Sequence, residues 1–361
     1  MRILAVSGAS GGHIFPAISF LQRLKKCRPD SSSLLVLPER SREKQISAEV
    51  CAVEYISSVS LSLKLDKKNL SALLKFFKGA AESLRLLLKF KPDIVVGFGS
   101  LDSLAIMLWA WILRIPTLIH EQNVVPGRAN RLLAKFCDKV AISFSQTKEF
   151  LEINPQRIIV TGNPIREDLK VIKKQEALDF FGLESGKFTV LVTGGSQGSR
   201  RINLSFLAAM QALPERDKIQ AVHISGQADF AFLKQAYSEL NAPVKLFAFL
   251  PQMQYAYCAA DLVISRAGAT TIAELAFFKA PAVLVPYPFA RAHQLSNARV
   301  LEKTGAAIII EDRCFDADNL SGKLSYFLYH AARLGEMRRG YAAVSITGAD
   351  ELLVQAALSL N

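Results

Sequence analysis

Short apolar runs recur along the chain, and most of them end at a glycine or a small polar turn. In the first half such runs lie at residues 2–7, 34–38, 93–99, 117–120, 139–143 and 157–162. Runs of this length, separated by longer helix-prone segments, are typical of strands that are buried on both faces of a sheet. This alternation predicts an α/β fold in which helices cover both sides of a parallel sheet.

The same pattern restarts after a charged, helix-prone segment at 166–187. Residues 188–203 repeat the opening order of strand, glycine turn and helix, and five further apolar runs follow. Because 361 residues are long for one core, the sequence predicts two doubly wound domains, 1–165 and 166–345. A helix-forming tail at about 346–361 is expected to pack back on the first domain. Ligands of such sheets collect at the carboxyl ends of strands, so the expected site is a cleft between the domains.

Composition narrows the class of protein. Half of the residues are hydrophobic and 21% are charged, as in a globular protein rather than a disordered one. The five cysteines are scattered and have no CxxC spacing, which predicts reduced thiols in the cytosol. The first residues run from a strand into a glycine turn, so no signal peptide is expected, and no apolar run reaches membrane-spanning length.

The overall charge is strongly positive. Lys and Arg number 44 against 32 Asp and Glu, and the net charge of +12 favours anionic partners such as phosphates or acidic lipids. Nucleic acid is not expected as a partner, because no basic segment is interleaved with aromatic residues on strands and no zinc-finger or other recognisable reading motif is present.

One segment, residues 67–91, concentrates cations and apolar residues together. A basic amphipathic helix is typical of contact with an anionic membrane surface. The alternative is a helix whose apolar face joins the core and whose basic face is solvated. The shortage of balancing acids, with Glu82 as the exception, favours the membrane interpretation. The predicted membrane contacts are Leu73, Lys75, Phe76, Phe77, Lys78 and Arg85.

The stretch from Ser265 to Ala298 has the features of a nucleotide-sugar site. An apolar run, DLVIS, leads into a helix that opens at Gly268–Thr271 and carries Glu274. The N–H groups and the positive dipole end of such a helix favour a diphosphate. A carboxylate one turn further in can accept hydrogen bonds from both hydroxyls of a ribose, so this stretch predicts a nucleotide-sugar site.

Two glycine-rich turns, Gly8–His13 and Gly194–Ser199, follow the first strands of the two domains. Small residues there let backbone N–H groups approach a phosphate closely. Neither turn has GxGxxG spacing or a following Gly-Lys-Ser/Thr, so NAD binding and ATP hydrolysis are not expected. His13 begins a helix, where the dipole favours a neutral imidazole that could serve as a general base. The structural alternative is a histidine that only hydrogen-bonds the start of the helix.

A polar quartet, His120–Asn123, follows another strand at the end where sites form. It predicts a binding role, and the alternative is a cap for the helix that begins near Pro126. A metal site at His120 and Glu121 is not expected, because adjacent residues of an extended chain point to opposite faces. The motifs above contain no DxD-like acidic pair for metal-assisted sugar transfer, and no cofactor is predicted.

Six motifs occur together and in a fixed order: GASGGHIFPA, HEQN, GNPIR, GGSQG, SRAGATTIAE and HQLSNA. With them the chain closely resembles the MurG family of peptidoglycan N-acetylglucosaminyltransferases over nearly its whole length. The resemblance implies a GT-B fold, two Rossmann-like domains facing across a cleft, with UDP-N-acetylglucosamine held mainly by the second. It implies inverting transfer of N-acetylglucosamine to the 4-hydroxyl of undecaprenyl-diphospho-N-acetylmuramyl-pentapeptide (lipid I), which yields lipid II without a metal.

The resemblance also implies a peripheral enzyme on the cytoplasmic face of the inner membrane. Its expected partners are lipid I, an anionic membrane surface and other cell-wall synthesis proteins, and its expected roles are in cell-wall biogenesis, cell shape, cell division and the cell cycle. His13 matches the proposed general base, Glu274 the ligand of the ribose hydroxyls, and Leu250 the residue whose backbone binds uracil. The other matching donor positions are Ser10, Gly11, Gly12, Asn123, Arg166, Ser196, Ala269, Thr270, Thr271, Ile272, Ala273 and Gln294.

The chain departs from the family pattern in two places, the loop at Gly97–Ala105 and Ala9. Members usually carry a GxGGYxSxP loop where this chain reads GFGSLDSLA from Gly97, so Ser100 and Leu101 replace a glycine and an aromatic. That loop faces the lipid-linked diphosphate in the family, which leaves two rivals open. One is a GT-B transferase that acts on another lipid, such as a diacylglycerol, and the other is a non-catalytic, membrane-docked nucleotide-sugar-binding subunit. Ala9 replaces a glycine, which is a mild change if its φ is negative.

Overall fold

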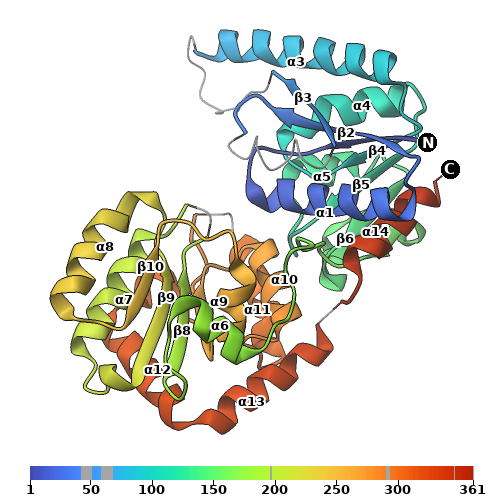
Figure 1. Cartoon of the computed structure of the whole chain (residues 1–361). Helices are drawn as coiled ribbons and strands as arrows, with labels where there is room; N and C mark the ends of the chain where they lie inside the picture. Colours follow the sequence, from blue (N-terminus) through green and yellow to red (C-terminus); the bar gives the residue numbers. More distant parts are fainter. Residues whose placement is uncertain (42–50, 58–67, 196, 290–292, 345, 361) are drawn as a thin grey trace. The chain divides into compact units, whose positions relative to one another are not determined.

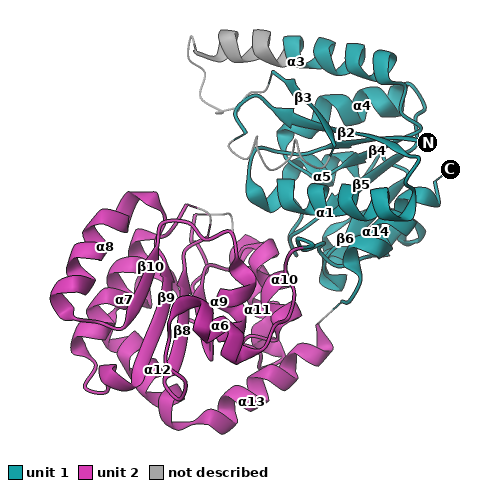
Figure 2. Ribbon diagram, viewed as in Figure 1, with its two compact units in different colours: residues 1–167, 346–361 teal, residues 168–345 magenta. Residues whose placement is uncertain are grey.

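The computed structural model describes the chain except residues 42–50, 58–67, 196, 290–292, 345 and 361, and for residues 68–76 it describes the helix but not the side chains. The described chain forms two compact units. Unit 1 comprises Met1–Glu167 and Ile346–Asn361, and unit 2 comprises Asp168–Ser345 (Figure 2). Each unit has its own parallel sheet flanked by helices, so the predicted α/β class with two parallel-sheet domains is confirmed.

Unit 1 contains a seven-stranded sheet in the order β3-β2-β1-β4-β5-β6-β7, and all neighbouring strands are parallel (Figure 1). Its strands are β1 Arg2–Val6, β2 Ser32–Pro38, β3 Ala52–Ile56, β4 Ile94–Gly97, β5 Thr117–Glu121, β6 Lys139–Ile142 and β7 Ile158–Val160. Its helices are α1 Gly11–Cys27, α3 Lys68–Phe90, α4 Leu104–Ile112, α5 Arg128–Leu133 and α14 Ala349–Leu358. Short 3₁₀ helices are η1 Leu101–Ser103, η2 Ser145–Phe150 and η3 Pro155–Arg157.

Both faces of this sheet are buried, as continuous apolar strands require. Along β1, Ile3 and Ala5 belong to the core beneath α1 and α14, whereas Leu4 and Val6 belong to the core beneath α3, α4 and α5. The two-residue period of a strand thus divides its side chains between two helix layers. Helix α14, the C-terminal tail, packs along α1 and completes one of these layers (Figure 1).

The six apolar runs of the first half correspond to β1, β2 and β4 to β7. The sequence pattern did not reveal β3. This strand pairs only with β2 at the edge of the sheet, and Glu54 and Tyr55 are exposed. An edge strand with one solvent-exposed face needs no continuous apolar run, so the hydrophobic pattern of the sequence marks it less clearly.

Unit 2 contains a six-stranded parallel sheet in the order β10-β9-β8-β11-β12-β13. Its strands are β8 Phe188–Thr193, β9 Ile219–Ile224, β10 Val244–Phe247, β11 Leu262–Ser265, β12 Ala282–Leu284 and β13 Ala307–Ile309. Its helices are α6 Lys174–Phe181, α7 Arg200–Ala212, α8 Gln227–Leu240, α9 Met253–Ala259, α10 Ala269–Phe278, α11 His293–Lys303, α12 Ala317–Tyr329 and α13 Ala331–Gly340. Its 3₁₀ helices are η4 Arg216–Lys218, η5 Asp312–Cys314 and η6 Tyr341–Ala343. Val190 and Val192 of β8 pack into a core shared with α7, α8, α12 and α13.

In both sheets the order of strand addition reverses beside the first strand of the unit. The reversal lies between β1 and β4 in unit 1 and between β8 and β11 in unit 2. Loops that leave neighbouring strands at such a switch point diverge and leave room for a ligand at the carboxyl ends. The two glycine-rich turns, Gly8–His13 and Gly194–Ser199, follow β1 and β8, so each lies at a switch point.

Candidate functional site

His13 lies in the first turn of α1, at the switch point of unit 1. The carbonyl of Ser10, the N-cap residue, accepts hydrogen bonds from the N–H groups of His13 and Ile14 at 2.9 and 3.0 Å. Two glycines flank its ring. A Cβ atom at Gly8 would lie 3.2 Å from Cδ2 of His13, and one at Gly99 would lie 3.3 Å from both Cε1 and Nδ1. Gly99 has a φ of +84°, so a side chain there would be strained as well as crowded.

Buried hydrogen bonds lead from this ring into unit 1. Nδ1 of His13 lies 3.2 Å from Oε1 of Gln122. Nε2 of Gln122 lies 3.1 Å from the carbonyl oxygen of Phe98 and 3.2 Å from Nδ1 of His120. Nε2 of His120 lies 3.0 Å from the carbonyl oxygen of Gly162. His120 is fully buried, and this burial lowers its pKa to about 4, so its ring is neutral near neutral pH.

The carboxylate of Glu121 organises the loop that follows β5. Oε1 accepts hydrogen bonds from the backbone and side-chain N–H groups of Asn123 at 2.9 and 3.2 Å. Oε2 accepts from the backbone N–H of Gly127 and from Nδ2 of Asn130 at 3.0 and 2.9 Å. These four donors satisfy the hydrogen-bonding capacity of the carboxylate, which explains how Glu121 can be only 2% exposed. Across the described part of the chain, no group of three or more His, Cys, Asp or Glu side chains could hold a metal ion.

The loop that departs from the family pattern packs directly against the turn after β1. A Cβ atom at Gly8 would lie 2.4 Å from Cβ of Ser100. Ser100 has φ +75° and ψ 154°, a conformation that suits glycine and strains other residues. Its hydroxyl donates to Asp102 at 2.8 Å, and both oxygens of Asp102 accept from Arg40 at 2.9 and 2.7 Å. Leu101, in place of an aromatic residue, is 44% exposed.

In unit 2, α10 begins at the switch point. Gly268 is its N-cap residue and has an extended backbone, with φ −64° and ψ 148°. The N–H groups of the first turn of a helix have no intrahelical partner and can bind an anion. The hydroxyl oxygen of Thr270 is buried and has no hydrogen-bond partner among the residues that the structure describes. The backbone N–H groups of the helix start are therefore the donors that can serve a phosphate.

Glu274 lies one turn further along α10. One of its carboxylate oxygens accepts a hydrogen bond from the hydroxyl of Tyr257 at 2.7 Å. Tyr257 is buried and stacks on Phe278, with ring centroids 4.9 Å apart. Tyr257 thus fixes the orientation of the carboxylate, and no motif in the sequence pointed to it, because it comes from a different helix, α9.

Gln294, in α11, ties two loops of this edge together. Its Oε1 accepts hydrogen bonds from the backbone N–H groups of Ala267 and Tyr287, at 3.2 and 2.9 Å. An oxygen held in this way directs the amide NH₂ group elsewhere, where it can donate to a ligand. In the same helix, Nδ2 of Asn297 donates to the carbonyl of Ala267 at 3.2 Å.

Arg266 is a buried cation that the sequence analysis missed. It is 9% exposed, and its guanidinium donates to the Val285 carbonyl at 3.0 Å and to the Ser199 hydroxyl at 2.8 Å. It also pairs with Asp312 at 2.5 Å. Arg266 therefore joins the turns that follow β8, β11 and β12. The signal that could have revealed it is a charged residue directly after the apolar strand DLVIS.

The remaining predicted residues of unit 1 lie near the start of α1 or near its side chains. Ser10 and Gly12 are exposed, whereas Gly11 is buried. The guanidinium of Arg166 lies 5.4 Å from the centre of the Phe15 ring, so this cation is placed over α1 rather than in unit 2.

In unit 2 the remaining predicted residues lie on or near the same edge of the sheet. Thr271 and Ala273 are half-buried on α10, and Ala269 and Ile272 are buried. The side chain of Ile272 is 1% exposed, so it anchors the helix and offers only its backbone to a ligand. Leu250 is buried in the turn between β10 and α9. Ser196 lies outside the described residues.

Helix α3 carries the predicted membrane contacts. Its described side chains divide between two faces, because Gly79, Ser83 and Leu87 are buried at intervals of four residues. Phe77 is 61% exposed. The exposed cations of this helix include Lys78 and Arg85. The side chains of Leu73, Lys75 and Phe76 lie outside the described residues.

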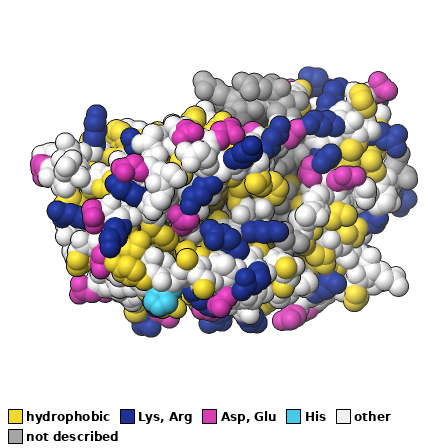
Figure 3. Space-filling model, turned by 60° about the horizontal axis from the view of Figure 1, so that its bottom comes forward, with side chains coloured by type: hydrophobic (Ala, Val, Ile, Leu, Met, Phe, Trp, Pro, Cys, Tyr) yellow, Lys and Arg dark blue, Asp and Glu magenta, His cyan; other side chains and the backbone are white. Residues whose placement is uncertain are grey.

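The end of α4 adds apolar surface beside α3. Nε1 of Trp109 donates to the carbonyl of Ala80 at 3.0 Å, which joins the two helices. Trp111, Ile112 and Leu113, at the end of α4, are 46%, 55% and 39% exposed. None of the helices in the described part of the chain has the length and apolar character needed to cross a bilayer. On the face shown in Figure 3, basic, acidic and apolar side chains are interspersed rather than sorted into single-sign stripes.

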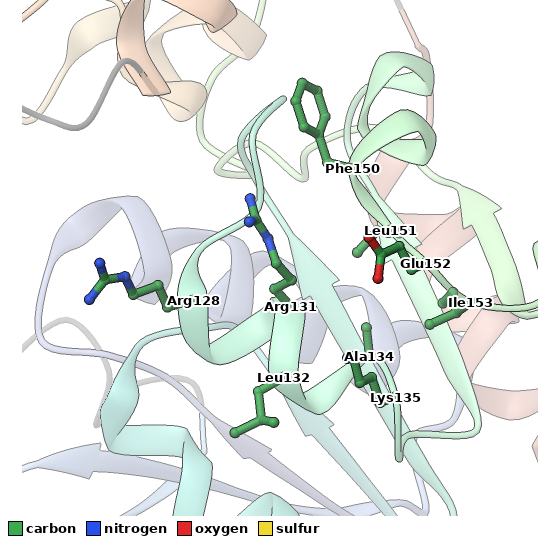
Figure 4. A pocket seen from close by; sticks show the side chains of 9 residues that line it. All are labelled: Arg128, Arg131, Leu132, Ala134, Lys135, Phe150, Leu151, Glu152 and Ile153. Atoms are coloured by element: carbon green, nitrogen blue, oxygen red, sulfur yellow. The ribbon is translucent and has the colours of Figure 1, made fainter.

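A hollow of about 280 Å³ lies beside α5 (Figure 4). Its lining includes three cations and one acid, together with apolar side chains. The cations Arg128, Arg131 and Lys135 recur at helical spacing, a signal that the sequence analysis did not use. The lining residues are Arg128, Arg131, Leu132, Ala134, Lys135, Phe150, Leu151, Glu152 and Ile153.

Comparisons with known proteins agree with this arrangement. The glycosyltransferase family 28 N-terminal domain matches residues 3–142, and the family 28 C-terminal domain matches residues 189–352. A protein of Listeria welshimeri is 35% identical over 364 residues, which cover 100% of this chain and 99% of the relative. A protein of Caldanaerobacter subterraneus is 36% identical over 361 residues, which cover 98% of each chain. Both relatives are named UDP-N-acetylglucosamine--N-acetylmuramyl-(pentapeptide) pyrophosphoryl-undecaprenol N-acetylglucosamine transferase.

Solved structures show the same fold. MurG of Acinetobacter baumannii matches with a TM-score of 0.77 at 25% identity, over 99% of this chain and 100% of that one. UDP-GlcNAc 2-epimerase of Neisseria meningitidis, bound to UDP-GlcNAc, matches with a TM-score of 0.70 at 16% identity, over 99% and 100% of the two chains. The second likeness concerns the fold alone. The GT-B fold that the sequence resemblance implies is confirmed.

Proposed function

This chain belongs to glycosyltransferase family 28, among the N-acetylglucosamine transferases that act on N-acetylmuramyl-(pentapeptide) pyrophosphoryl-undecaprenol, and from this premise we propose that it converts lipid I into lipid II. The donor is UDP-N-acetylglucosamine. The 4-hydroxyl of the acceptor's N-acetylmuramyl sugar attacks C1 of the donor sugar while the bond from C1 to the diphosphate breaks. UDP leaves, the configuration at C1 inverts, and the hydroxyl proton passes to a base.

Unit 2 holds the donor in this proposal. The start of α10 binds the diphosphate, where its N–H groups offset the negative charge that grows on the leaving UDP. Glu274, oriented by Tyr257, accepts from the ribose hydroxyls, and the NH₂ group of Gln294 donates to the sugar. The backbone of Leu250 binds uracil. The other proposed donor contacts are Ser10, Gly11, Gly12, Asn123, Arg166, Ser196, Ala269, Thr270, Thr271, Ile272 and Ala273.

Unit 1 supplies the base. The single observation that carries this part is the His13 ring between Gly8 and Gly99, with its Nδ1 on Gln122 and its helix start at a switch point. A residue oriented by this hydrogen bond is pre-organised to take a proton, and general-base catalysis of this kind contributes roughly 10²- to 10⁴-fold.

The membrane contact that we propose lies on α3 and the end of α4 in unit 1. Support comes from the exposed Phe77, the cations Lys78 and Arg85, and the exposed apolar end of α4. Reversing the charges in Lys78→Glu/Arg85→Glu is expected to weaken cosedimentation with vesicles that contain an anionic lipid, and neutral vesicles serve as the control. Unchanged binding to anionic vesicles would remove the proposed contact. We also propose, from the family resemblance, a peripheral location on the cytoplasmic face of the inner membrane, beside other cell-wall synthesis proteins.

Transfer of radiolabelled N-acetylglucosamine to a lipid I analogue tests the function. We expect labelled product with lipid I and none with a diacylglycerol, which is the rival acceptor that the altered loop at Ser100 and Leu101 raises. Donor binding without any product from either acceptor would favour the rival of a non-catalytic binding subunit. Product from the diacylglycerol alone would replace the proposed acceptor.

A further inference from the structure

The hydrogen bonds behind His13 have only one consistent arrangement of protons. They begin at the carbonyl oxygen of Gly162, which can only accept, so Nε2 of His120 at 3.0 Å must carry a hydrogen. The hydroxyl of Ser143, 3.5 Å from the same nitrogen, donates to the Glu121 carbonyl and so can only accept from it. A neutral imidazole has one donor and one acceptor, so Nδ1 of His120 carries the lone pair.

This lone pair fixes the amide of Gln122. One end of the amide faces three acceptors, namely the Phe98 carbonyl at 3.1 Å, Nδ1 of His120 at 3.2 Å and the His120 carbonyl at 3.3 Å. Only the NH₂ end can donate to these groups, so the oxygen must be at the other end. That oxygen lies 3.2 Å from Nδ1 of His13. Because an amide oxygen only accepts, Nδ1 of His13 carries the hydrogen and Nε2 carries the lone pair.

We propose that Gln122, held by His120, is a positioning residue that fixes the tautomer of His13 and leaves Nε2 as the atom that takes the acceptor's proton. This inference rests on the proposed role of His13 as the base. Gly8 and Gly99 leave room for the ring, because a Cβ atom at either position would contact it. The hydrogen bond to Gln122 selects the tautomer and orients the ring, and the glycines leave the space that the ring occupies.

Four other titratable or charged groups surround this network and bear on its pH dependence. His120 lies behind Gln122, and the Glu121 carboxylate holds Asn130, whose Nδ2 lies 3.3 Å from where a Cβ atom at Gly99 would be. On the other side, Ser100 bonds Asp102. The fourth of these groups is Arg40, which pairs with Asp102. These groups are unchanged in the variants below, so a shift in pH dependence reports on residue 122.

The tautomer can be read directly, without activity, from ¹⁵N NMR of histidine-labelled protein at a pH where His13 is neutral. We expect the His13 signals of a protonated Nδ1 and an unprotonated Nε2. Gln122→Met, which removes the acceptor at similar length, is expected to give a mixture of tautomers. A wild-type spectrum with unprotonated Nδ1, or a Gln122→Met spectrum identical to wild type, would overturn the inference. His13→Ala with full activity would instead overturn the proposed base and leave the tautomer result standing.

Kinetics give a second readout that a purely structural role would not move. Gln122→Met is expected to lower kcat roughly 10- to 100-fold, less than loss of the base itself, with the KM for UDP-N-acetylglucosamine unchanged. Gln122→Glu keeps an acceptor at Nδ1 but adds a negative charge that favours the imidazolium, so the acidic limb of the pH–rate profile should move to higher pH. The matched control is Gln156→Met, an exposed glutamine of the same unit. A Gln122→Glu profile that coincides with wild type would count against the inference.

Discussion

Units 1 and 2 each contain a buried histidine near the switch point, but the hydrogen bonds of the two histidines connect to different kinds of group. In unit 1, His120 connects through Gln122 to His13, whose ring lies at the mouth of the loops after β1 and β4. In unit 2, Nε2 of His223 lies 3.0 Å from Oδ1 of Asn203, whose Nδ2 donates to the Ser225 carbonyl at 2.9 Å.

The hydrogen bonds around His223 connect groups that stabilise the fold of unit 2. Nδ2 of Asn203 also donates to Asp229 at 2.8 Å, and Asp229 pairs with Arg200, whose side chain is 76% exposed. Nothing in this network presents an unused base at the ligand edge, where α10, Glu274 and Gln294 stand instead. The same sheet topology thus supports a reactive side chain in unit 1 and a set of fixed donors and acceptors in unit 2. This difference fits the proposal that unit 1 performs the proton transfer and unit 2 provides most of the donor contacts.

The largest effects are expected from substitutions that remove proton transfer and donor binding separately. His13→Ala is expected to lower kcat roughly 10²- to 10⁴-fold and to leave donor affinity unchanged, because it removes only the base. Glu274→Ala should weaken donor binding by about 10- to 100-fold, because a charged hydrogen-bond acceptor is lost. Initial rates with a lipid I analogue and calorimetric titration with UDP-N-acetylglucosamine measure the two quantities. Equal losses of donor affinity in both variants would contradict the division between the units.

The two buried histidines, His120 and His223, predict a loss of stability at acidic pH that is smaller than the effect expected of His13→Ala. Burial lowers the pKa of His120 to about 4 and that of His223 to about 3, from an ordinary value of 6.5. Since the unfolded state binds the proton more tightly, each unit keeps its full stability above about pH 6.5 and loses it as the pH falls toward the folded-state pKa. Each histidine should reduce the free energy of unfolding by about 2 kcal/mol at pH 5 relative to pH 7.

Amide hydrogen exchange, resolved for peptides that contain β5 and β9, measures this loss in each unit separately. In a His223→Gln variant, the loss between pH 7 and pH 5 should shrink for β9 by about 2 kcal/mol and stay the same for β5. A β9 segment whose pH dependence does not change in that variant would rule out His223 as the cause.

The smallest effect concerns the strained loop of unit 1. Ser100 has φ +75°, whereas the residue that opens the corresponding helix in unit 2, Gly268, has φ −64°. Ser100→Ala and Ser100→Gly both lose the hydrogen bond to Asp102, but only the glycine variant also relieves the strain. The Ser100→Gly protein should therefore be more stable than the Ser100→Ala protein by about 1 kcal/mol in urea denaturation followed by a unit 1 probe. An alanine variant as stable as the glycine variant would mean that the loop relaxes without strain.

Much of the architecture could be predicted from the sequence. The apolar runs marked the central strands because strands buried on both faces need apolar side chains at every position. The glycine turns after β1 and β8 marked the switch points, since only small residues allow such close packing there. The edge strand β3 could not be predicted, because a strand with one solvent-exposed face lacks a continuous apolar run.

The candidate site was predicted unevenly. His13, Glu274 and Gln294 could be singled out because each stands inside a motif of contiguous residues. Tyr257 and Arg266 could not, because their importance arises from contacts with residues far away in the chain. Whether the remaining predicted contacts bind the donor stays a prediction.

The sequence by itself determined that the chain forms parallel sheets, where their glycine turns fall, and to which family the motifs belong, because these properties depend on local pattern and spacing. Only the tertiary structure decided which nitrogen of His13 is available. That choice depends on groups in β5 and just after β4, β5 and β7. The bonded pairs Gln122–Phe98 and His120–Gly162 lie 24 and 42 positions apart in the chain and meet only when the sheet forms. Hydrogen bonds act over about 3 Å, so their direction is set by folded geometry and not by order along the chain.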